Sequence, residues 1–501
     1  MNPLPSFPWL SLLVFLPLAG AFLCVLRRHE PVECRALALA TSLVLFGVTL
    51  WLFIRFHAGS NGWFLFEDFA WIPRFGIRFT LGLDGLSLLM VLLTGFLQVV
   101  AVLVSWPVKR HGPLFFALLL LLESGLMGVF LALDLVLFYL FWEVMLIPMF
   151  FLIGVWGHER RIYAAIKFFL YTLAGSLLML VALLALYLLH GEQTGLYSFA
   201  LADLLKTELT TGQSWLLFAG FMLAFAIKTP LIPFHTWLPD AHTEAPTAGS
   251  VDLAGLLLKT GVYGLLRIAF PLFPGPTAAF LPFLGALAVG GIFYGAWIAT
   301  AQVDAKRLVA YSSVSHLGYV ILGLTAWNAT ALSGSILQMF NHGITTGALF
   351  CMIGMIDSRA KTRQLDSLGG LWARMPVLSG FFLFFSLASL GLPGLNNFTG
   401  EIIILLGTFK VHPVLTILAA AGVVLAAAYM LRLVREILWG PPLGTDPWPD
   451  LTLREGLILV PMAILVVWLG LYPATFLAPL DGTLANLLHS GASLAQAGGA
   501  P

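Results

Sequence analysis

The chain has 501 residues, of which 60% are hydrophobic and only 10% are charged, and its formal net charge is +1. Soluble globular domains carry about 25% charged residues, so a soluble protein of this size could not cover its surface with so few charges. The composition indicates a polytopic membrane protein, and the near-zero net charge points away from nucleic acid as a partner. Cys24, Cys34 and Cys351 lack the spacing of a disulfide framework, a zinc site or an iron–sulfur cluster.

Long apolar runs predict α-helical spans, because membrane β-barrels show alternating segments of about ten residues instead. At roughly 20 residues per crossing, the chain contains about fourteen spans. We interpret the first as a retained span rather than a cleaved signal peptide, because no basic region precedes it. The approximate ranges are 8–26, 36–56, 81–105, 114–131, 133–155, 163–188, 214–235, 248–270, 278–300, 306–326, 332–356, 376–408, 412–438 and 455–478.

The distribution of Lys and Arg between alternating loops orients these spans. By the positive-inside rule the richer set is cytoplasmic, so both termini are expected outside. The richer set is Arg27, Arg28, Arg35, Lys109, Arg110, Arg160, Arg161, Lys306, Arg307, Arg359, Lys361, Arg363, Arg374, Arg432, Arg435 and Arg454. The poorer set is Arg55, Arg74, Arg78, Lys206, Arg267 and Lys410.

Seven ionisable side chains stand out within apolar runs of the predicted spans, where an ionised group costs about 2.5 to 3.5 kcal/mol. They are Glu123, Glu143, Lys228, Lys259, His316, His342 and Glu401. Such residues face a partner or a wet cavity and mark ion or proton paths. Histidine suits a relay because it titrates nearest to neutral pH. A Glu–Lys pair whose separation changes would act as a switch. Glu143 with Lys228 is the candidate pair, Lys259 the candidate central carrier and Glu401 a terminal one.

Helical spacing places several polar residues on common faces. Asp252 and Lys259 are seven residues apart, which predicts one face and a separation of about two turns. Gln338 and His342 also share a face. Asp134 is expected near the outer interface and cannot form a carboxylate pair with Glu143, because nine residues separate them and they point to opposite sides.

These residues also have structural interpretations. A single intramembrane His commonly forms a hydrogen bond between helices, and a lone Glu or Lys can join helices. Six such groups on six helices favour a proton or ion path, whereas Glu123 stays open between the two interpretations. Lys167 is expected to snorkel at the inner interface. Asp240, His242 and Glu244 are expected in a solvated loop, where they could also collect protons.

Two hydrophobic spans are interrupted by helix-breaking residues beside a charge. Residues 221–244 read FMLAFAIKTPLIPFHTWLPDAHTE, with Pro230 and Pro233 directly after Lys228, and residues 387–401 read LASLGLPGLNNFTGE, ending in Glu401. Proline removes a backbone donor, and irregular backbone at membrane depth is tolerated only around a buried or wet site. Transporters with inverted repeats carry broken helices at corresponding positions of their halves. The two breaks, five spans apart, predict such a repeat, although Pro and Gly also occur in ordinary transmembrane helices.

Several stretches resemble the antiporter-like subunits of the proton-pumping NADH:quinone oxidoreductase, respiratory complex I. They are FAIKTPLIPFHTWLPDAHTEAPTAGSVDLAGLLLKTGVYGLLR, AQVDAKRLVAYSSVSHLGYV, GLPGLNNFTGE, WIPRFGIRFTLGLDGLSLLM and FWEVMLIPMFFLIGVWG, which together extend over most of the chain. The M-type subunits, counterparts of mitochondrial subunit 4, are the most similar. Glu401 stands where L and N subunits usually carry lysine, and no long lateral helix is expected after the last span.

The resemblance implies an all-α membrane fold of about fourteen helices with two inverted five-helix repeats and broken seventh and twelfth helices. It divides the chain into three N-terminal helices (1–113), a first repeat (114–270), a second repeat (278–438) and a C-terminal helix with a tail (439–501). The positions that match the family's proton-translocating residues are Glu143, Lys228, Lys259, His316, His342 and Glu401, with His235 as a further candidate.

The resemblance also implies the setting of the chain. It would hold no cofactor or metal, and the FMN, iron–sulfur clusters and quinone would belong to partner subunits. The partners would be the neighbouring L and N subunits, small membrane subunits, the peripheral redox arm and membrane lipids. The expected location is the bacterial inner membrane, with both termini on the periplasmic side. Quinone reduction elsewhere in the complex would drive proton movement along the axis.

Other functions remain open at this point. A subunit of a cation/proton antiporter, or the membrane subunit of an energy-converting hydrogenase, would share the fold and most motifs. The charges could instead only hold helices together in a structural anchor. His316 and His342, on separate helices, could in principle be axial ligands of a haem in an electron-transfer protein.

Overall fold

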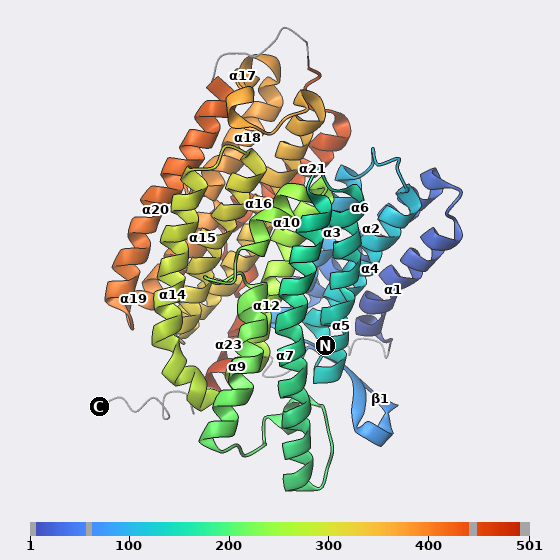
Figure 1. The fold of residues 1–501 in the computed structure, drawn as a ribbon, viewed down its shortest axis with the longest axis vertical. Coiled ribbons are helices and arrows are strands. Elements are labelled where there is room, and N and C mark those ends of the chain that lie inside the picture. Colours follow the sequence, from blue (N-terminus) through green and yellow to red (C-terminus); the bar gives the residue numbers. More distant parts are fainter. Residues whose placement is uncertain (1–6, 57–62, 440–447, 491–501) are drawn as a thin grey trace.

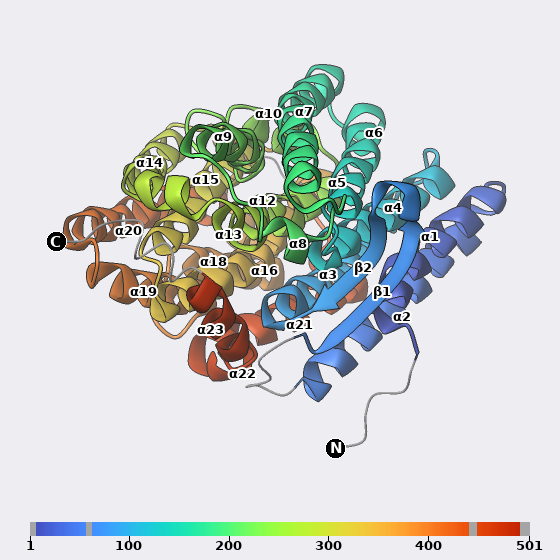
Figure 2. The same ribbon diagram turned by 90° about the horizontal axis from the view of Figure 1, so that it is seen from below.

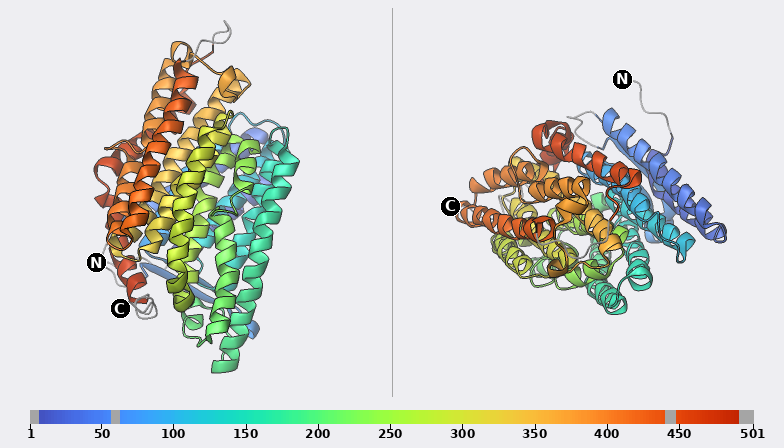
Figure 3. Two further views of the ribbon diagram at one scale, coloured as in Figure 1. Left: turned by 60° about the vertical axis from the view of Figure 1, so that its left-hand side comes forward. Right: turned by 90° about the horizontal axis from the view of Figure 1, so that it is seen from above.

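The computed structural model of the chain describes residues 7–56, 63–439 and 448–490. Within these residues, twelve helices are long and apolar enough to cross a membrane. Two further crossings are each built from two shorter helices, α9 (Thr211–Lys228) with α10 (Trp237–Glu244), and α18 (Pro376–Ser389) with α19 (Asn396–Phe409). Twelve and two agree with the fourteen predicted spans. Most of the long helices run along one common direction (Figure 1; Figure 3, left).

The remaining helices follow in chain order. The first five crossings are α1 (Trp9–Leu26), α2 (Pro31–Arg55), α3 (Gly85–Val104), α4 (Gly112–Leu131) and α5 (Leu135–Val144) continued by α6 (Leu146–Trp156). The sixth crossing is α7 (Arg161–Thr194), and the short α8 (Leu201–Leu204) follows it. The eighth crossing has five segments, α11 (Thr247–Asp252), the π-helix η2 (Leu253–Leu257), α12 (Leu258–Gly264), the π-helix η3 (Leu265–Ala269) and α13 (Phe270–Leu272).

The second half begins with α14 (Pro274–Thr300), α15 (Ala305–Thr325) and α16 (Ala329–Ala360), followed by the 3-10 helix η4 (Leu365–Ser367) and α17 (Leu371–Arg374). The thirteenth crossing is α20 (Pro413–Val434) with the π-helix η5 (Arg435–Trp439), and the last is α21 (Leu453–Leu471). The short α22 (Ala474–Leu477) and α23 (Leu480–Ser490) come after it.

A β-hairpin lies in the segment that the sequence suggested only as a long outer connection. β1 (Leu65–Ile72) and β2 (Ile77–Leu83) are antiparallel, joined by the 3-10 helix η1 (Pro73–Phe75), with Leu65 opposite Leu83. Figure 2 shows the hairpin across the lower face of the N-terminal helices. Glu67 of β1 accepts hydrogen bonds from the backbone N–H groups of Leu10 and Ser11 at 2.7 and 2.9 Å. The hairpin thereby satisfies donors at the start of α1 that have no partner within the helix.

Several helix starts are set by polar residues that accept hydrogen bonds from the first free N–H groups. Asp84 accepts from Ser87 at 3.0 Å, and Asp134 accepts from Val136 and Leu137. Asp134 also accepts from the backbone N–H of Arg78 in the hairpin at 3.0 Å. Its role is therefore to join α5 to the hairpin.

The two halves of the membrane domain repeat the same packing. α7 packs against both parts of the seventh crossing, α9 and α10, and α16 packs against both parts of the twelfth, α18 and α19. The matching segments are five crossings apart. Because five is an odd number, the second unit runs through the membrane in the opposite direction, which makes the repeat an inverted one.

The least apolar crossings occupy the centre of the bundle. The side chains of the eighth crossing are fully buried over its whole membrane-length window, and those of α15 and α16 are almost as completely buried. α2, α20 and α21 are mostly exposed and form the outer layer. Figure 2 and the right view of Figure 3 show this arrangement along the helix axes. The polar residues of α12, α15 and α16 therefore face other helices and not the lipid.

The end of α9 lies so close to the eighth crossing that the residue of the eighth crossing at the contact, Gly261, has no room for a side chain. A Cβ added at Gly261 would lie 2.3 Å from Oγ1 of Thr229 and 2.9 Å from the carbonyl oxygen of Phe225. We expect Gly261→Ala to destabilise the fold by about 1 to 3 kcal/mol, because the break in the seventh crossing would have to move outward. The measurement is the melting temperature and membrane abundance of the chain.

Gly290 is the matched control for this substitution, because it also lies inside a helix, α14, and a Cβ there would meet no atom within 4 Å. We expect Gly290→Ala to leave abundance and melting temperature unchanged or slightly raised. Equal losses at the two positions would contradict the role given to Gly261.

Candidate functional site

Lys259 lies at the middle of the eighth crossing, between the π-helices η2 and η3. Its side chain is completely buried. The ammonium group donates a hydrogen bond to the carbonyl of Ala254 inside η2 and lies 2.7 Å from Nδ1 of His342 on α16. π-helices interrupt the regular pattern of backbone hydrogen bonds and occur frequently at functional sites. The crossing thus supplies the lysine with a backbone acceptor, and the neighbouring helix supplies an imidazole.

A series of short contacts continues from Lys259 to Glu401. The rings of His342 and His316 have their centroids 5.9 Å apart. Nδ1 of His316 lies 2.8 Å from Oε1 of Glu401, and the side-chain amide of Gln338 donates to the same oxygen at 3.2 Å. Lys259, His342, His316 and Glu401 come from four different helices, α12, α16, α15 and α19. The structure therefore brings together four of the predicted residues in one buried row.

Two hydroxyl groups that lie near His316 were not identified from the sequence. Nε2 of His316 lies 3.3 Å from the Tyr429 hydroxyl and 3.5 Å from Oγ of Ser389. Serine and tyrosine are unremarkable in a transmembrane helix, so only the fold identifies them. Both ring nitrogens of His316 are thus engaged with protein groups. This arrangement does not fit the haem hypothesis, which requires a free ring nitrogen as an iron ligand.

Lys228 and Glu143, the predicted switch pair, do not form an ion pair within 4.0 Å in the described part of the chain. The ammonium group of Lys228 lies instead over the rings of Trp142 and Phe168, 5.2 and 5.7 Å from their centroids. Such cation–π contacts are worth about 2 kcal/mol when desolvated. The ammonium group of Lys228 is therefore held by aromatic rings and not by the Glu143 carboxylate.

A kink places Glu143 beside a break in the fifth crossing. α5 ends at Val144 and α6 begins at Leu146, and Pro148 follows. Proline lacks the N–H that would bind the carbonyl four residues earlier, which is that of Val144. Oε1 of Glu143 has no hydrogen-bond partner among the described residues. The carboxylate thus stands at an opening of the helical backbone in the middle of a membrane span.

His235 lies within the break of the seventh crossing, between the end of α9 and the start of α10, and not past it as the sequence indicated. The ring is buried and meets the ring of Tyr294 edge-on at 4.9 Å, and its Nδ1 has no partner among the described residues. It lies outside the row from Lys259 to Glu401. The contacts of His235 therefore leave its predicted role untested.

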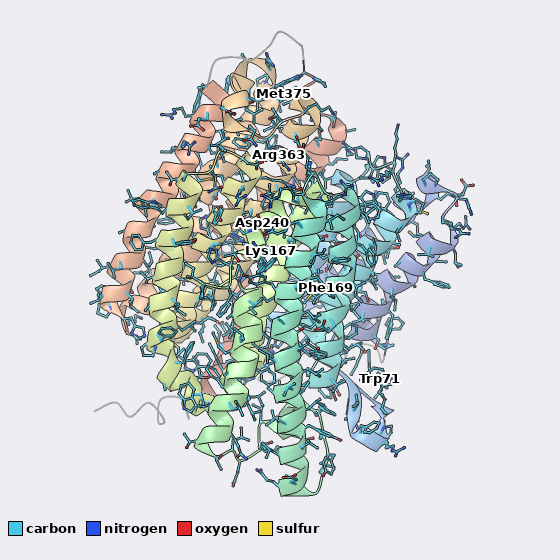
Figure 4. All side chains as sticks on the ribbon, in the orientation of Figure 1. Trp71, Lys167, Phe169, Asp240, Arg363 and Met375 are labelled. Carbon is cyan, nitrogen blue, oxygen red and sulfur yellow. The ribbon has the colours of Figure 1, made fainter. Side chains whose placement is uncertain are left out.

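The expectation of a solvated loop at Asp240, His242 and Glu244 was wrong, because these residues form α10, the second part of the seventh crossing. Asp240 lies 2.7 Å from the ammonium group of Lys167, so this lysine is paired with a carboxylate of α10. Figure 4 shows the two side chains next to each other below Arg363. The ring of His242 is fully buried and stacks on Phe350 with centroids 4.8 Å apart. Proline at the break suggested an end of the helix, whereas the helix resumes at Trp237, after the eight residues 229–236 that follow the end of α9.

Two residues that the orientation argument placed in loops are also buried. Lys306 is 2% exposed and donates to the carbonyl of Ala245 at the end of α10, and Arg267 is 8% exposed and lies 2.5 Å from Asp84. Without them the two Lys/Arg sets hold 15 and 5 residues. The bias between the two membrane sides is therefore unchanged.

The shared face predicted for Asp252 and Lys259 is also wrong, because η2 occupies the five residues between Asp252 and Leu258. Seven residues match two turns only in a regular α-helix, and a π-helix has a wider turn. Lys259 faces His342, whereas neither carboxylate oxygen of Asp252 has a hydrogen-bond partner among the described residues. Gln338 and His342 lie one turn apart in the regular helix α16, as the prediction of a shared face requires. The Gln338 amide reaches Glu401.

A polar cavity opens at the Lys/Arg-rich end of the bundle, with a volume of about 520 Å³. Its walls come from the loops after α6, α14 and α16 and from the end of α10, and they include His158, Glu244, Asp304, Asp357 and Arg363. Burial, aided by the positive charges of Arg363 and Lys306, lowers the pKa of His158 to about 4. The His158 ring is therefore neutral at neutral pH. The cavity lies beside Glu244, at the end of the helix that carries His242.

The paired broken helices and the buried row of Lys, His and Glu define a class of membrane protein that moves ions or protons through its core. The family model "NADH:quinone oxidoreductase/Mrp antiporter, TM" matches residues 132–426. This range includes both breaks, the four residues of the row, and Glu143 and Lys228. The chain belongs to this NADH:quinone oxidoreductase/Mrp antiporter family.

The relatives of the chain are similar over nearly its whole length. NADH-quinone oxidoreductase subunit M of Pseudomonas aeruginosa is 47% identical over 93% of this chain and 94% of that protein. Subunit M of Escherichia coli K12 is 44% identical, with 96% and 97% covered, and NADH-ubiquinone oxidoreductase chain 4 of Marchantia polymorpha is 42% identical, with 97% and 98% covered.

Solved structures share the fold. A chain of respiratory complex I from Thermus thermophilus with bound NADH superimposes with a TM-score of 0.86 at 35% identity, covering 96% of this chain and 99% of that one. A chain of the Mrp complex from Dietzia sp. also reaches a TM-score of 0.86, but at 22% identity, covering 98% of this chain and 99% of that one. The second likeness concerns the fold alone.

The buried ion pair of Asp84 and Arg267 joins α3 to the eighth crossing at the end opposite the polar cavity. We expect Asp84→Asn to destabilise the fold by about 3 to 5 kcal/mol, because the buried Arg267 charge would lose its partner. Asp68→Asn is the control, since Asp68 and Arg78 form a more exposed pair, and an exposed pair is worth about 1 kcal/mol or less. Membrane abundance and melting temperature measure both, and similar losses would contradict the assignment.

Proposed function

We propose that the chain is a proton-translocating membrane subunit of an NADH:quinone oxidoreductase. The observation that carries the proposal is the buried row of Lys259, His342, His316 and Glu401, with hydrogen-bond distances at both ends and adjacent imidazole rings between them. Every member of the row can bind and release a proton. The names of the relatives, subunit M and chain 4, support the same assignment.

Proton movement along the row needs only short displacements. A proton on Nζ of Lys259 can pass to Nδ1 of His342 across 2.7 Å, and a proton on His316 can pass to Oε1 of Glu401 across 2.8 Å. Transfer between the two imidazoles requires a ring rotation or an intervening water molecule, because their centroids are 5.9 Å apart. His235 is proposed as a further proton-carrying group near the break of the seventh crossing.

The control of this movement is assigned to Glu143 and Lys228. Their charges are separated in the structure, and Lys228 is held by aromatic rings. A change outside the chain that stabilises or removes the negative charge of Glu143 would change the electrostatic potential at Lys228, and through it the protonation of Lys259. The redox reaction itself is assigned to partner subunits, which would hold FMN, the iron–sulfur clusters and quinone.

The exposed surface around Glu143 supports the proposal that a neighbouring membrane subunit contacts the chain there. Glu143 is partly exposed, and Leu140 and Ile147, one turn away on either side, are 41% and 49% exposed. A carboxylate facing lipid at this depth is costly, so a protein surface that covers it is expected. The related antiporter-like subunits L and N are the proposed neighbours. We also propose that the chain lies in the bacterial inner membrane with both termini on the periplasmic side.

The functional units proposed for the chain are the three N-terminal helices (1–113), the repeats 114–270 and 278–438, and the C-terminal part (439–501). The first repeat carries Glu143, Lys228 and Lys259, and the second carries His316, His342 and Glu401. The contact between Lys259 and His342 therefore joins one repeat to the other.

The central test is the substitution Lys259→Ala in the intact complex in membrane vesicles. We expect normal complex abundance and a loss of proton translocation of about a hundredfold, because the row loses the group that receives the proton. Glu143→Ala should assemble and pump poorly for the same reason. Lys410→Ala, an exposed lysine after α19, is the control and should match the wild type.

The alternatives give different results. If the charges only held helices together, abundance and activity would fall in parallel in Lys259→Ala. Normal pumping by assembled Lys259→Ala and Glu143→Ala complexes would reject the proposal. Sodium- or potassium-driven proton exchange in vesicles without quinone chemistry would favour an antiporter instead.

A further inference from the structure

The ring of His316 on α15 is held at both of its nitrogen atoms. Nδ1 lies 2.8 Å from Oε1 of Glu401 on α19. Nε2 lies 3.3 Å from the hydroxyl of Tyr429 on α20 and 3.5 Å from Oγ of Ser389 on α18. All four residues are buried, and none is more than 6% exposed. Three neighbouring helices therefore fix the position of one imidazole ring.

The ring of His342, the other imidazole of the row, is held differently. Its Nδ1 lies 2.7 Å from Nζ of Lys259, whereas its Nε2 has no hydrogen-bond partner among the described residues. The planes of the two imidazole rings are inclined by 58° and their centroids are 5.9 Å apart. One ring is thus anchored at both nitrogens, and the other has one nitrogen available for water or for movement.

The two hydroxyl groups suit a ring that changes its protonation state. A Ser or Tyr hydroxyl donates a hydrogen bond to an unprotonated ring nitrogen and accepts one from a protonated nitrogen. An ionised carboxylate only accepts and an ammonium group only donates, so either would serve one of these states alone. Tyr429 and Ser389 can therefore keep the ring of His316 in place both before and after it gains a proton.

The break in the twelfth crossing brings two of these partners to the same ring. Ser389 is the last residue of α18, directly before the break, and Glu401 lies in the second turn of α19 after it. In an unbroken helix the twelve residues between these positions would separate them by about 18 Å along the axis, too far for both to contact one imidazole. Gly391, inside the break, has φ +85°, and a Cβ there would lie 3.5 Å from Oε2 of Glu401. The break therefore folds a hydroxyl and a carboxylate toward opposite edges of His316.

We propose that Tyr429 and Ser389 are positioning residues, whose hydroxyl groups keep the ring of His316 aligned with its proton acceptor. In the transfer that they align, the imidazolium of His316 gives the proton on Nδ1 to Oε1 of the Glu401 carboxylate, which leaves a neutral imidazole and a carboxylic acid. His316 is the fixed ring of the row, so the movement needed between the two imidazoles belongs to His342. This inference rests on the proposed function of the row.

The decisive comparison is between Ser389→Thr and Ser389→Val in the assembled complex in membrane vesicles. Threonine and valine have nearly the same shape, but only threonine keeps a hydroxyl group. We expect Ser389→Thr to pump close to the wild-type rate and Ser389→Val to lose about three- to tenfold of its proton translocation, because one aligning hydrogen bond is lost. Ser386→Ala is the control, since Ser386 is also buried in α18 and its hydroxyl has no partner among the described residues.

A packing role predicts a different result, because Thr and Val fill the same space and would lower pumping and complex abundance equally. Equal pumping by the two Ser389 variants would therefore overturn the positioning role of Ser389.

Tyr429→Phe tests the second hydroxyl, and it decides the matter if the Ser389 variants do not assemble. Phe keeps the aromatic ring, and we expect the same loss of about three- to tenfold in proton translocation. Tyr319→Phe is the matched control, because the buried Tyr319 hydroxyl also joins α15 to α20 but donates to the carbonyl of Ala419. It should pump like the wild type. Equal losses in the two Phe variants, or normal pumping by Tyr429→Phe, would contradict the proposal.

Lys259→Ala, measured in the same vesicles, separates this inference from the proposed function. If Lys259→Ala is defective while Ser389→Val and Tyr429→Phe pump normally, the positioning role is wrong and the function of the row stands. If Lys259→Ala also pumps normally, the proposed function itself has failed.

Discussion

An ammonium group in the hydrocarbon layer needs polar partners that its own apolar helix does not normally offer. Lys259 meets this need through the carbonyl of Ala254, inside a π-helical segment, and through His342 of a neighbouring helix. His342 in turn lies beside His316, and His316 binds Glu401. Each polar group therefore has its partner on another helix, which places these helices at the centre of the bundle. The more apolar helices, such as α2 and α20, are left to face the lipid.

The two helix breaks depend on the same constraint, because irregular backbone in a membrane must find hydrogen-bond partners within the protein. At the first break the indole N–H of Trp237 donates to the carbonyl of Ile227 at 2.9 Å. At the second, Asn341 of α16 donates to the carbonyl of Asn396 at 2.7 Å, and Asn396 donates back to the carbonyl of Asn341 at 3.1 Å. These hydrogen bonds tie both breaks, and with them the chain next to Lys228 and Glu401, to other parts of the protein.

Glu401, at one end of the row, and Glu143, outside the row, differ in their surroundings. Glu401 is 6% exposed and is bound by His316 and Gln338. Glu143 is partly exposed, lies beside a kink and has an oxygen without a partner among the described residues. The Glu401 carboxylate is therefore held by side chains of this chain. The surroundings of the Glu143 carboxylate depend on the molecule that covers it. A neighbouring subunit can change the charge of Glu143 more readily than that of Glu401.

Much of this protein is determined by the sequence alone, because membrane insertion acts on local properties. Apolar runs of sufficient length predict the crossings, and proline beside a charge predicts both breaks. The rarity of ionisable residues in such runs singles out Lys259, His316, His342 and Glu401. Family resemblance then assigned them a common role.

The tertiary structure decided which of these residues touch. The π-helix before Lys259 depends on packing between helices, so regular spacing misplaced Asp252. Non-local partners also settled what a single chain segment cannot show, namely that His242 is buried, that Lys306 and Arg267 are not loop charges, and that Glu67 caps α1. Sequence patterns report hydrophobicity and local backbone preference, whereas contacts between helices distant in the chain arise only when all of them pack around the same buried charges.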